Sequence, residues 1–182
     1  MMRKALKSLL VLAVALLLML VFRALAFTIY IVDGEGLQPV FHSGDRVLVN
    51  RWSYGLRTGS DEGLFGYGRL LRRQIGKGDI VAYEDPTDPT RSRVLLGRCR
   101  ALPGDTVRYR GRLELVPSLA NCAGADYYWM QALGDNNPTD SRELGFVSEQ
   151  SIIGRVVLVV YNHDTSAPVW AGYQWNRTLI RK

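Results

Sequence analysis

The feature that most constrains this chain is a long apolar run at residues 8–22, near the N-terminal end of the sequence. The run contains no charged side chain, and the sequence stays largely apolar as far as Val32, with Arg23 as the one charged interruption. A helix needs about 20 apolar residues to cross the hydrocarbon core of a bilayer. Residues 8–32 are therefore predicted to form a transmembrane helix followed by a membrane-proximal segment.

Basic residues before the apolar run set its expected orientation. Arg3, Lys4 and Lys7 all precede the run. Positively charged residues that flank a membrane span stay preferentially in the cytoplasm. We therefore expect residues 1–7 to be cytoplasmic and residues 33–182 to lie outside, as a single-pass protein of the cell (inner, cytoplasmic) membrane.

The same segment also resembles a secretory signal that is removed after export. A basic start, an apolar core and small residues before the cut are typical of such signals, and Ala24 and Ala26 would place the cut before Phe27. The uncleaved anchor is favoured because Arg23 directly follows the apolar run and residues 27–32 remain apolar beyond the cut. Both interpretations send the rest of the chain across the membrane.

The net charge of +6 overstates how basic the exported part is. Four of the 23 basic residues flank the apolar run, which leaves 19 to face all 17 acidic residues in the remainder. A nucleic-acid-binding surface needs a concentrated basic patch. The composition therefore argues against a nucleic-acid partner.

Beyond residue 33 the sequence alternates short β-type segments with turn residues such as Gly76, Gly78, Pro103 and Gly104. Regularly spaced short strands with this punctuation are typical of an all-β domain. The fold is therefore predicted to be mostly β, as a small domain behind one N-terminal transmembrane helix. The expected strands are residues 46–49, 79–83, 93–96, 106–109, 127–133 and 152–161.

Residues 56–76 are expected to be an exposed, solvated loop. They are rich in glycine and carry Arg69, Arg72 and Arg73. Contact between these arginines and anionic lipid headgroups is the alternative interpretation.

The two cysteines, Cys99 and Cys122, both lie in the part that is expected to be outside. An oxidising compartment favours a disulfide between them, and two buried free thiols are the alternative. The two histidines, His42 and His163, are far apart in the sequence, and no CxxC spacing occurs. Neither a metal site nor a cofactor is therefore expected.

Four short sequence motifs of turn and strand residues, called boxes below, follow the apolar run. They are residues 34–39 with Gly44-Asp45 and Tyr54-Gly55, residues 78–81, residues 97–105, and Gly134-Asp135-Asn136 with Asp140-Ser141-Arg142 and Gly145. Each box is weak alone, since Pro-Gly-Asp by itself indicates only a turn. Together, in this order over residues 23–155, they resemble the type I signal peptidases, the membrane serine proteases that remove signal peptides.

The resemblance implies a mostly-β domain and a dyad in which a serine attacks the peptide carbonyl and a neutral lysine accepts its proton. Counting back from Pro39 puts Gly36 at the serine position, and counting back from Pro103 puts Gly97 at the lysine position. Gly34 stands where the family has a further oxyanion donor. Because glycine has neither a hydroxyl nor an amine, it is open whether the chain is an enzyme, and inactivity is favoured.

The resemblance also assigns residues to a substrate groove and to a supporting box. In the family the groove takes an extended peptide as an added strand, and such main-chain hydrogen bonds do not require the dyad. In active members of the family the supporting box orients the lysine of the dyad. Because this chain has no lysine at that position, the box is expected to hold strands together instead. The groove residues are Gly34, Glu35, Gly36, Leu37 and Pro39, and the supporting-box residues are Asp135, Asp140, Ser141 and Arg142.

Other residues are poor substitutes for the missing dyad. The exported lysines are Lys77, which lies between two glycines, and Lys182, whereas a lysine that acts as a base must be desolvated. A serine–histidine arrangement would need His42 or His163 with an orienting carboxylate such as Asp164. The spacing of these residues supports neither arrangement.

The sequence leads to three hypotheses. The first is an inactive signal peptidase homologue that binds exported, signal-peptide-bearing proteins, or helps to assemble or process them, at the membrane. The second is an active signal peptidase with a different nucleophile. The third is an accessory subunit that pairs with an active signal peptidase.

Overall fold

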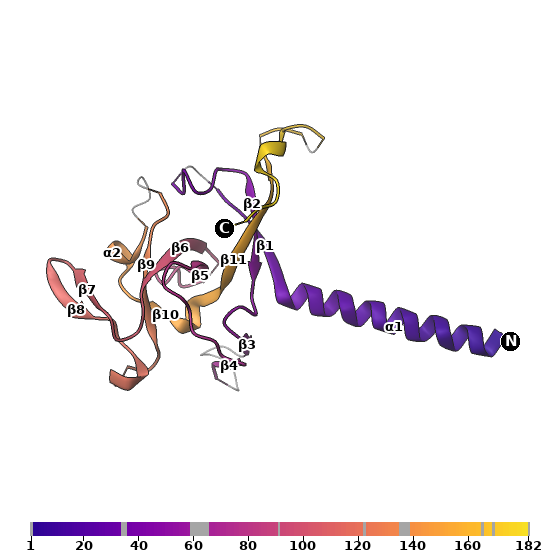
Figure 1. The fold of residues 1–182 in the computed structure, drawn as a ribbon, viewed down its shortest axis with the longest axis horizontal. Coiled ribbons are helices and arrows are strands. Elements are labelled where there is room, and N and C mark those ends of the chain that lie inside the picture. Colours follow the sequence, from indigo (N-terminus) through magenta and orange to yellow (C-terminus); the bar gives the residue numbers. More distant parts are fainter. Residues whose placement is uncertain are drawn as a thin grey trace.

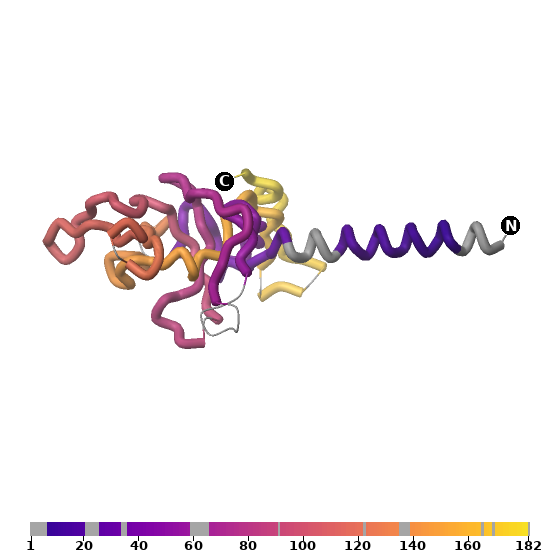
Figure 2. The backbone as a smooth tube through the Cα atoms, turned by 90° about the horizontal axis from the view of Figure 1, so that it is seen from below, coloured from indigo at the N-terminus to yellow at the C-terminus, as the bar shows by residue number. Residues whose placement is uncertain are grey.

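The computed structural model describes residues 2–33, 36–58, 66–90, 92–121, 123–134, 139–164, 166–168 and 170–181, apart from the side chains of residues 2–6 and 21–25. A long helix, α1 (Met2–Ala26), precedes a β domain and projects outward from it (Figures 1 and 2). The side chains of residues 7–20 on this helix are exposed. Within the described residues, no helix meets the length and apolarity required of a membrane span.

One curled sheet of nine strands makes up most of the domain. Its order is β1-β2-β11-β5-β6-β9-β10, and β12 and β13 also pair with β11. Two separate hairpins, β3–β4 and β7–β8, complete the strands, and β7–β8 lies at the end of the domain far from α1 (Figure 1). The strand bounds are β1 Phe27–Ile31, β2 Asp45–Asn50, β3 Leu56–Thr58, β4 Gly68–Leu70, β5 Ile80–Glu84, β6 Val94–Ala101, β7 Thr106–Tyr109, β8 Arg112–Leu115, β9 Tyr127–Gln131, β10 Val147–Ser148, β11 Ile152–His163, β12 Tyr173–Gln174 and β13 Ile180–Arg181, and a short helix, α2, spans Ser141–Leu144.

The apolar core follows from the alternation of side chains along the strands. On β2, Val47 and Val49 are fully buried, whereas Leu48 between them is only half-buried. This is the period of two that a strand with one buried face requires. The valines pack with Phe41, Val156 and Val159 in one cluster.

A second cluster surrounds strands β5, β6 and β9. It contains Tyr83, Cys99, Met130 and Ile152, all of them almost fully buried. The predicted strands 79–83, 127–133 and 152–161 correspond to β5, β9 and β11, whereas β6 continues past the predicted end at residue 96 as far as Ala101 and so includes Cys99. The mostly-β prediction is confirmed. Only α1 and α2 are α-helices among the described residues.

The C-terminal segment is fastened to the start of β2 by a buried ion pair. Asp45 is completely buried, and its carboxylate accepts hydrogen bonds of 3.0 and 2.6 Å from the guanidinium of Arg177. The same carboxylate accepts hydrogen bonds from the side chain of Asn162 and from the backbone N–H of His42. β12 and β13, which flank Arg177, pair with β11.

Two expectations need correction. Helix α1 ends at Ala26, and Phe27–Ile31 forms the edge strand β1, so part of the segment expected to be membrane-proximal belongs to the sheet. Residues 56–76 are not simply a solvated loop, because their described ends form the hairpin β3–β4.

Two arginines of this hairpin region form hydrogen bonds and ion pairs with other segments of the domain. The side chain of Arg69 is only 1% exposed, and it donates to the backbone carbonyls of Gly55, Glu149 and Ile152. Arg72 forms ion pairs with Asp126 and Glu149. The expectation of an exposed, solvated loop is therefore wrong at Arg69, because carbonyl oxygens on distant segments bind its buried guanidinium, whereas Arg72 stays partly exposed while it pairs with carboxylates of the domain.

Candidate functional site

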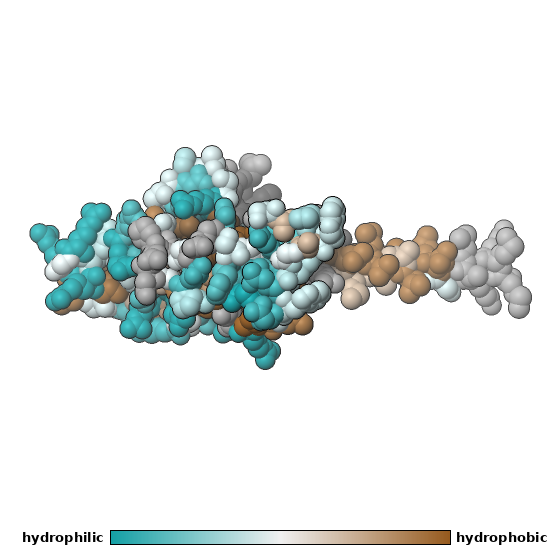
Figure 3. Space-filling view, turned by 90° about the horizontal axis from the view of Figure 1, so that it is seen from above, coloured by the Kyte–Doolittle hydropathy of each residue, from teal (hydrophilic) through white to brown (hydrophobic). Residues whose placement is uncertain are grey.

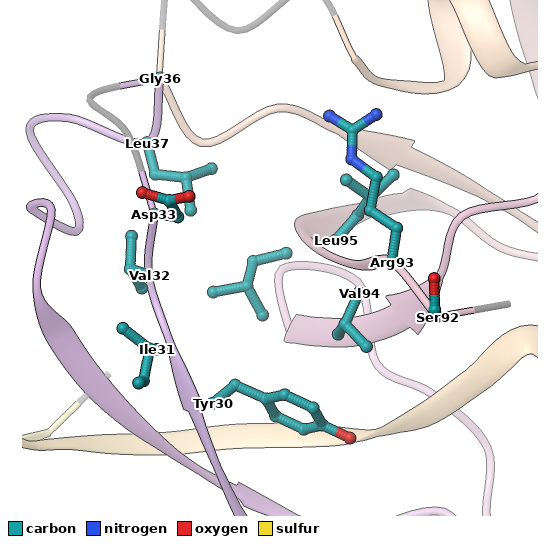
Figure 4. Close-up of a pocket in the computed structure, with 11 residues that line it drawn as sticks. Tyr30, Ile31, Val32, Asp33, Gly36, Leu37, Ser92, Arg93, Val94 and Leu95 are labelled. Carbon is teal, nitrogen blue, oxygen red and sulfur yellow. The ribbon is translucent and has the colours of Figure 1, made fainter. Parts of the chain in front are cut away.

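A cleft separates the edge strand β1 from the first half of β6. Its cavity has a volume of about 450 Å³, and Figure 4 shows its two walls, with Tyr30 pointing across from one wall toward Val94 and Ser92 on the other. The lining residues are Tyr30, Ile31, Val32, Asp33, Gly36 and Leu37 on one side and Ser92, Arg93, Val94, Leu95 and Leu96 on the other. Segments about 60 positions apart in the sequence thus form one groove.

The wall formed by β1 has a free strand edge. Among the described strands β1 pairs only with β2, and Val32 exchanges backbone hydrogen bonds of 2.8 and 2.9 Å with Asp45 and Gly44. Backbone groups alternate in direction along an antiparallel strand. The N–H and C=O groups of Ile29 and Ile31 therefore point away from β2, toward the cleft.

The opposite wall has a free edge as well. The carbonyl of Arg93 accepts a hydrogen bond from the N–H of Asp85 on the β5 side, and the N–H of Cys99 donates to Asp79 on the same side. By the same alternation, the backbone groups of Val94 and Leu96 point away from β5. Strand β9 covers this edge of β6 only from Arg98 onward. Within the part of the chain that the structure describes, the cleft is thus bordered by unpaired main-chain groups on both sides.

The serine position of the first box lies at one end of this cleft. Gly36 and Leu37 line the cavity, and Leu37 also packs against the core. Pro39 is exposed and does not line it. The other two groove residues predicted from the sequence, Gly34 and Glu35, lie outside the described residues.

The lysine position lies in β6, one residue beyond the lining residue Leu96. Gly97 is buried, and a Cβ atom on it would lie 3.1 Å from Cε1 of Tyr83, 3.3 Å from the carbonyl oxygen of Gln131 and 3.4 Å from Cβ of Met130. These contacts are tighter than ordinary packing. The space beside Gly97 is therefore filled by Tyr83 and by strand β9.

The segment after β9 connects the two glycine positions. Gln131 on β9 contacts the space beside Gly97, and Gly134, three residues later, lies directly against the backbone of the first box. A Cβ atom on Gly134 would overlap the carbonyl oxygen of Gly36 and lie 2.6 Å from that of Gln38. The absence of a side chain at Gly134 thus permits this close approach.

The supporting box fixes β9 through side-chain hydrogen bonds. The hydroxyl of Ser141 accepts a bond of 2.8 Å from the N–H of Met130, and the buried carboxylate of Asp140 accepts one of 3.2 Å from the N–H of Ala132. Asp140 also caps α2 by accepting from the N–H and the side chain of Arg142. These contacts are those of a structural element that joins α2 to β9. Asp135 lies outside the described residues.

No residue with an activated hydroxyl is found in the described lining of the cleft. Ser92 lines it, and its hydroxyl bonds to Asp88 at 3.0 Å and to Thr90 at 2.9 Å. The hydrogen bonds that Thr90 and the backbone of Arg93 donate hold the pKa of Asp88 far below its ordinary value. Such a carboxylate is a weak base, so it leaves Ser92 a weak nucleophile.

The other substitutes considered from the sequence lie elsewhere. Lys77 is 56% exposed and forms an ion pair of 2.9 Å with Asp105, so it is not a desolvated base. The ring of His163 faces the carbonyl of Pro168, and the carboxylate of Asp164 accepts hydrogen bonds from Ser166. None of these residues lines the cleft. Lys182 lies outside the described residues.

Cys99 carries a free, buried thiol on β6. Burial, together with the nearby carboxylates of Asp79 and Asp105, raises the pKa of this thiol to about 12. Cys122 lies outside the described residues. The structure therefore favours the alternative of a buried free thiol at Cys99 over the disulfide.

Sequence reasoning missed the wall of the cleft opposite the first box. Residues 93–96 were predicted as a strand, but their role as an open edge depends on where β9 stops pairing with β6. Tyr30 was counted with the membrane-proximal segment. The alternation of residues 27–31, which the structure shows as exposed and half-buried positions in turn, is the signal that could have identified β1.

Comparison with known proteins agrees with this geometry. A family model described as "Signal peptidase, peptidase S26" matches residues 5–116, which is more than half of the chain. The chain is 22% identical over 184 residues to "Inactive signal peptidase IA" of Staphylococcus aureus (strain COL), covering 88% of this chain and 94% of that protein.

Two relatives named "Signal peptidase I" match a shorter region. The chain is 32% identical over 95 residues to "Signal peptidase I" of Pseudomonas fluorescens and 30% identical over 95 residues to that of Pseudomonas aeruginosa. Each match covers 52% of this chain but only 31% of the relative, so the chain spans about a third of their length. The family model, which matches more than half of the chain, leads to one conclusion: this chain belongs to the signal peptidase family, peptidase S26.

Proposed function

We propose that this protein is a catalytically silent signal peptidase homologue that binds an extended segment of exported proteins. The observation that carries the proposal is the cleft itself: it keeps two free strand edges, but Gly36 stands at its end and Gly97 beside it. Strand addition draws its affinity from main-chain hydrogen bonds. The glycines remove the chemistry and leave those bonds available.

The loss of chemistry is large in energetic terms. Removing a serine nucleophile alone lowers kcat by a factor on the order of 10⁶. Here the predicted base position is glycine as well, and the hydroxyl of Ser92, the serine that lines the described part of the cleft, is hydrogen-bonded to a carboxylate of low basicity. Binding without cleavage is therefore the activity that the residues support.

The proposal places the protein at a membrane, with α1 as its anchor, residues 1–7 in the cytoplasm and the β domain outside. The exposed apolar side chains along α1, seen in brown in Figure 3, and the basic residues before them support this arrangement. The exposed Trp170 and Trp175 lie in the C-terminal segment at the end of the domain from which α1 leaves (Figures 1 and 2). Tryptophan is enriched at membrane interfaces.

The experiment uses the full chain in lipid nanodiscs and fluorescent peptides that copy the residues around signal-peptide cleavage sites. Anisotropy measures binding, and mass spectrometry of the same samples measures cleavage. We expect saturable binding with intact peptide after prolonged incubation. Specific cleavage that is lost in one serine variant, such as Ser92→Ala, would instead establish an active enzyme.

The binding mode has its own test. A peptide lying between two free edges directs alternate N–H groups to β1 and to β6, so N-methylation at either of two neighbouring central residues should weaken binding. Weakening at only one of them would show pairing with one edge alone. N-methylation of a terminal residue outside the cleft is the matched control.

Co-purification distinguishes the accessory-subunit hypothesis from the binding of exported proteins. Crosslinked membranes should yield exported precursors if the cleft binds clients. Recovery of an active signal peptidase with no precursor, unchanged when a competing peptide fills the cleft, would favour subunit pairing.

A further inference from the structure

A second cavity, of about 310 Å³, adjoins the cleft at its end near α1. It shares Tyr30, Ser92 and Val94 with the first cavity, so the two cavities lie side by side. The backbone N–H of Arg51, which lines it, bonds to the carbonyl of Ala26 at the end of α1. Its full lining is Thr28, Tyr30, Arg51, Leu56, Arg57, Glu84, Ser92, Val94 and Ile153.

The charges in this second cavity do not cancel. Arg57 and Glu84 form an ion pair of 2.6 Å, with side chains only 18% and 16% exposed. Arg51 has no carboxylate partner among the residues that the structure describes. Counting only the described residues, the cavity therefore carries one positive charge that no carboxylate balances, and a half-buried charge is stabilised by a partner of opposite sign.

A hydroxyl donor accompanies this charge. Tyr30 lines the cavity, and Figure 4 shows its ring extended toward the Ser92 wall. Burial raises the pKa of Tyr30, so its hydroxyl is protonated at neutral pH and can donate. A guanidinium with a hydroxyl donor is a suitable receptor for a carboxylate.

We propose that this second cavity selects client segments with an acidic side chain, Asp or Glu, through Arg51. The inference rests on the proposed function, because the acidic residue belongs to the peptide that occupies the cleft. Alternate residues of a strand point to the same face. The acidic residue should therefore lie two or four positions from the residue that fills the larger cavity, on the side nearer to α1.

The test is peptide binding to the full chain in nanodiscs of zwitterionic phosphatidylcholine. One alanine-rich fluorescent peptide is prepared with Glu, Gln or Lys at each position in turn. At one position the Glu peptide should bind about tenfold more tightly than the Gln peptide, a difference of ~1.4 kcal/mol. Arg51→Gln should remove this preference, so that the Glu and Gln peptides bind the variant with equal affinity.

Three further variants sharpen the result. Arg51→Glu should shift the preference to the Lys peptide. Glu84→Gln, which frees Arg57, should strengthen the preference for Glu. Arg112→Gln, at an exposed arginine on the β7–β8 hairpin, is the matched control and should change nothing.

The outcomes separate the two proposals. Equal binding of the Glu, Gln and Lys peptides at every position would overturn the acidic-residue inference and leave the proposed function standing. Absence of binding by all peptides would overturn both. If Arg51→Gln weakens binding of the isolated chain to vesicles containing phosphatidylglycerol while the peptides show no preference, Arg51 contacts lipid headgroups and the inference is wrong.

Discussion

The ring of Tyr83 on β5 occupies the space beside Gly97 on β6, so that a Cβ atom at Gly97 would lie 3.1 Å from Cε1 of Tyr83. Tyr83 is only 1% exposed and is held in a cluster with Met130 and Ile152. The position that the sequence resemblance assigns to the family's lysine is thus part of a packed core in this chain.

We predict that Gly97→Ala destabilises the domain by about 1–3 kcal/mol, as expected for an extra methyl group in a packed core. Urea unfolding followed by circular dichroism measures the change. Gly124→Ala is the matched control, because a Cβ atom at Gly124 meets no other atom within 4 Å. A Gly97→Ala variant as stable as the control would contradict this prediction, because it would show that the Tyr83 ring moves aside without a cost in stability.

The double variant Gly36→Ser with Gly97→Lys returns both dyad residues to the cleft. We expect slow but detectable cleavage of a preprotein, because the groove is retained, together with a lower melting temperature than the wild type, because the lysine displaces Tyr83. Gly36→Ala with Gly97→Lys is the control for the hydroxyl and should not cleave. Cleavage by the wild type at the rate of the double variant would contradict the assignment of the dyad positions.

The supporting box is predicted to stabilise the folded domain. Asp140→Ala leaves the N–H groups of Ala132 and Arg142 without their acceptor, and an unsatisfied buried group costs about 1–3 kcal/mol. Arg142→Ala removes only the exposed half of the ion pair, whose side chain is 68% exposed, and should cost under about 1 kcal/mol. Chemical denaturation of the two variants compares them, and equal losses would refute the structural role.

The ion pair of Asp45 with Arg177 predicts a pH-dependent contribution to stability. Burial by itself raises the pKa of Asp45, but the hydrogen bonds from Arg177, His42 and Asn162 outweigh it and lower the pKa below 3.8. The carboxylate is therefore easier to ionise in the folded state. Its contribution is present above about pH 4 and is lost as the pH falls through the lowered value.

Arg177→Met should destabilise the protein by about 3–5 kcal/mol at neutral pH, because it leaves a buried carboxylate without its cation. The difference from the wild type should shrink as the pH falls below about 4. Urea unfolding at a series of pH values measures it. Arg181→Met, on β13 at an exposed position, is the control, and a difference that does not vary with pH would contradict the role of Asp45.

Cys99 is predicted to be unreactive in the folded protein. Its buried thiol has a pKa raised to about 12, so little thiolate exists near neutral pH. In a Cys122→Ser background, alkylation by iodoacetamide at pH 7.5 should be slow before unfolding and fast after it, as followed by mass spectrometry. Rapid labelling of the folded protein would show that β6 opens at this position.

Much of the fold could be predicted from sequence because it depends on local patterns. The alternation of apolar residues around Val47 and the turn residues near Pro103 placed the strands correctly. Arg69 could not be placed in this way. Its burial depends on Glu149 and Ile152, about 80 positions away, and nothing near Arg69 in the sequence indicates them.

The sequence by itself pointed to the family, which the family model confirms, and it predicted a missing dyad, because a glycine lacks a hydroxyl or an amine wherever it folds. Only the tertiary structure decided that Gly36 ends an open cleft, that Tyr83 fills the space at Gly97 and that Arg51 lies in a cavity beside this cleft. Each of these depends on how the sheet curls and where β9 leaves the edge of β6. The physical reason is that side-chain identity belongs to one residue, whereas a free strand edge and a cavity arise only from the pairing of distant segments.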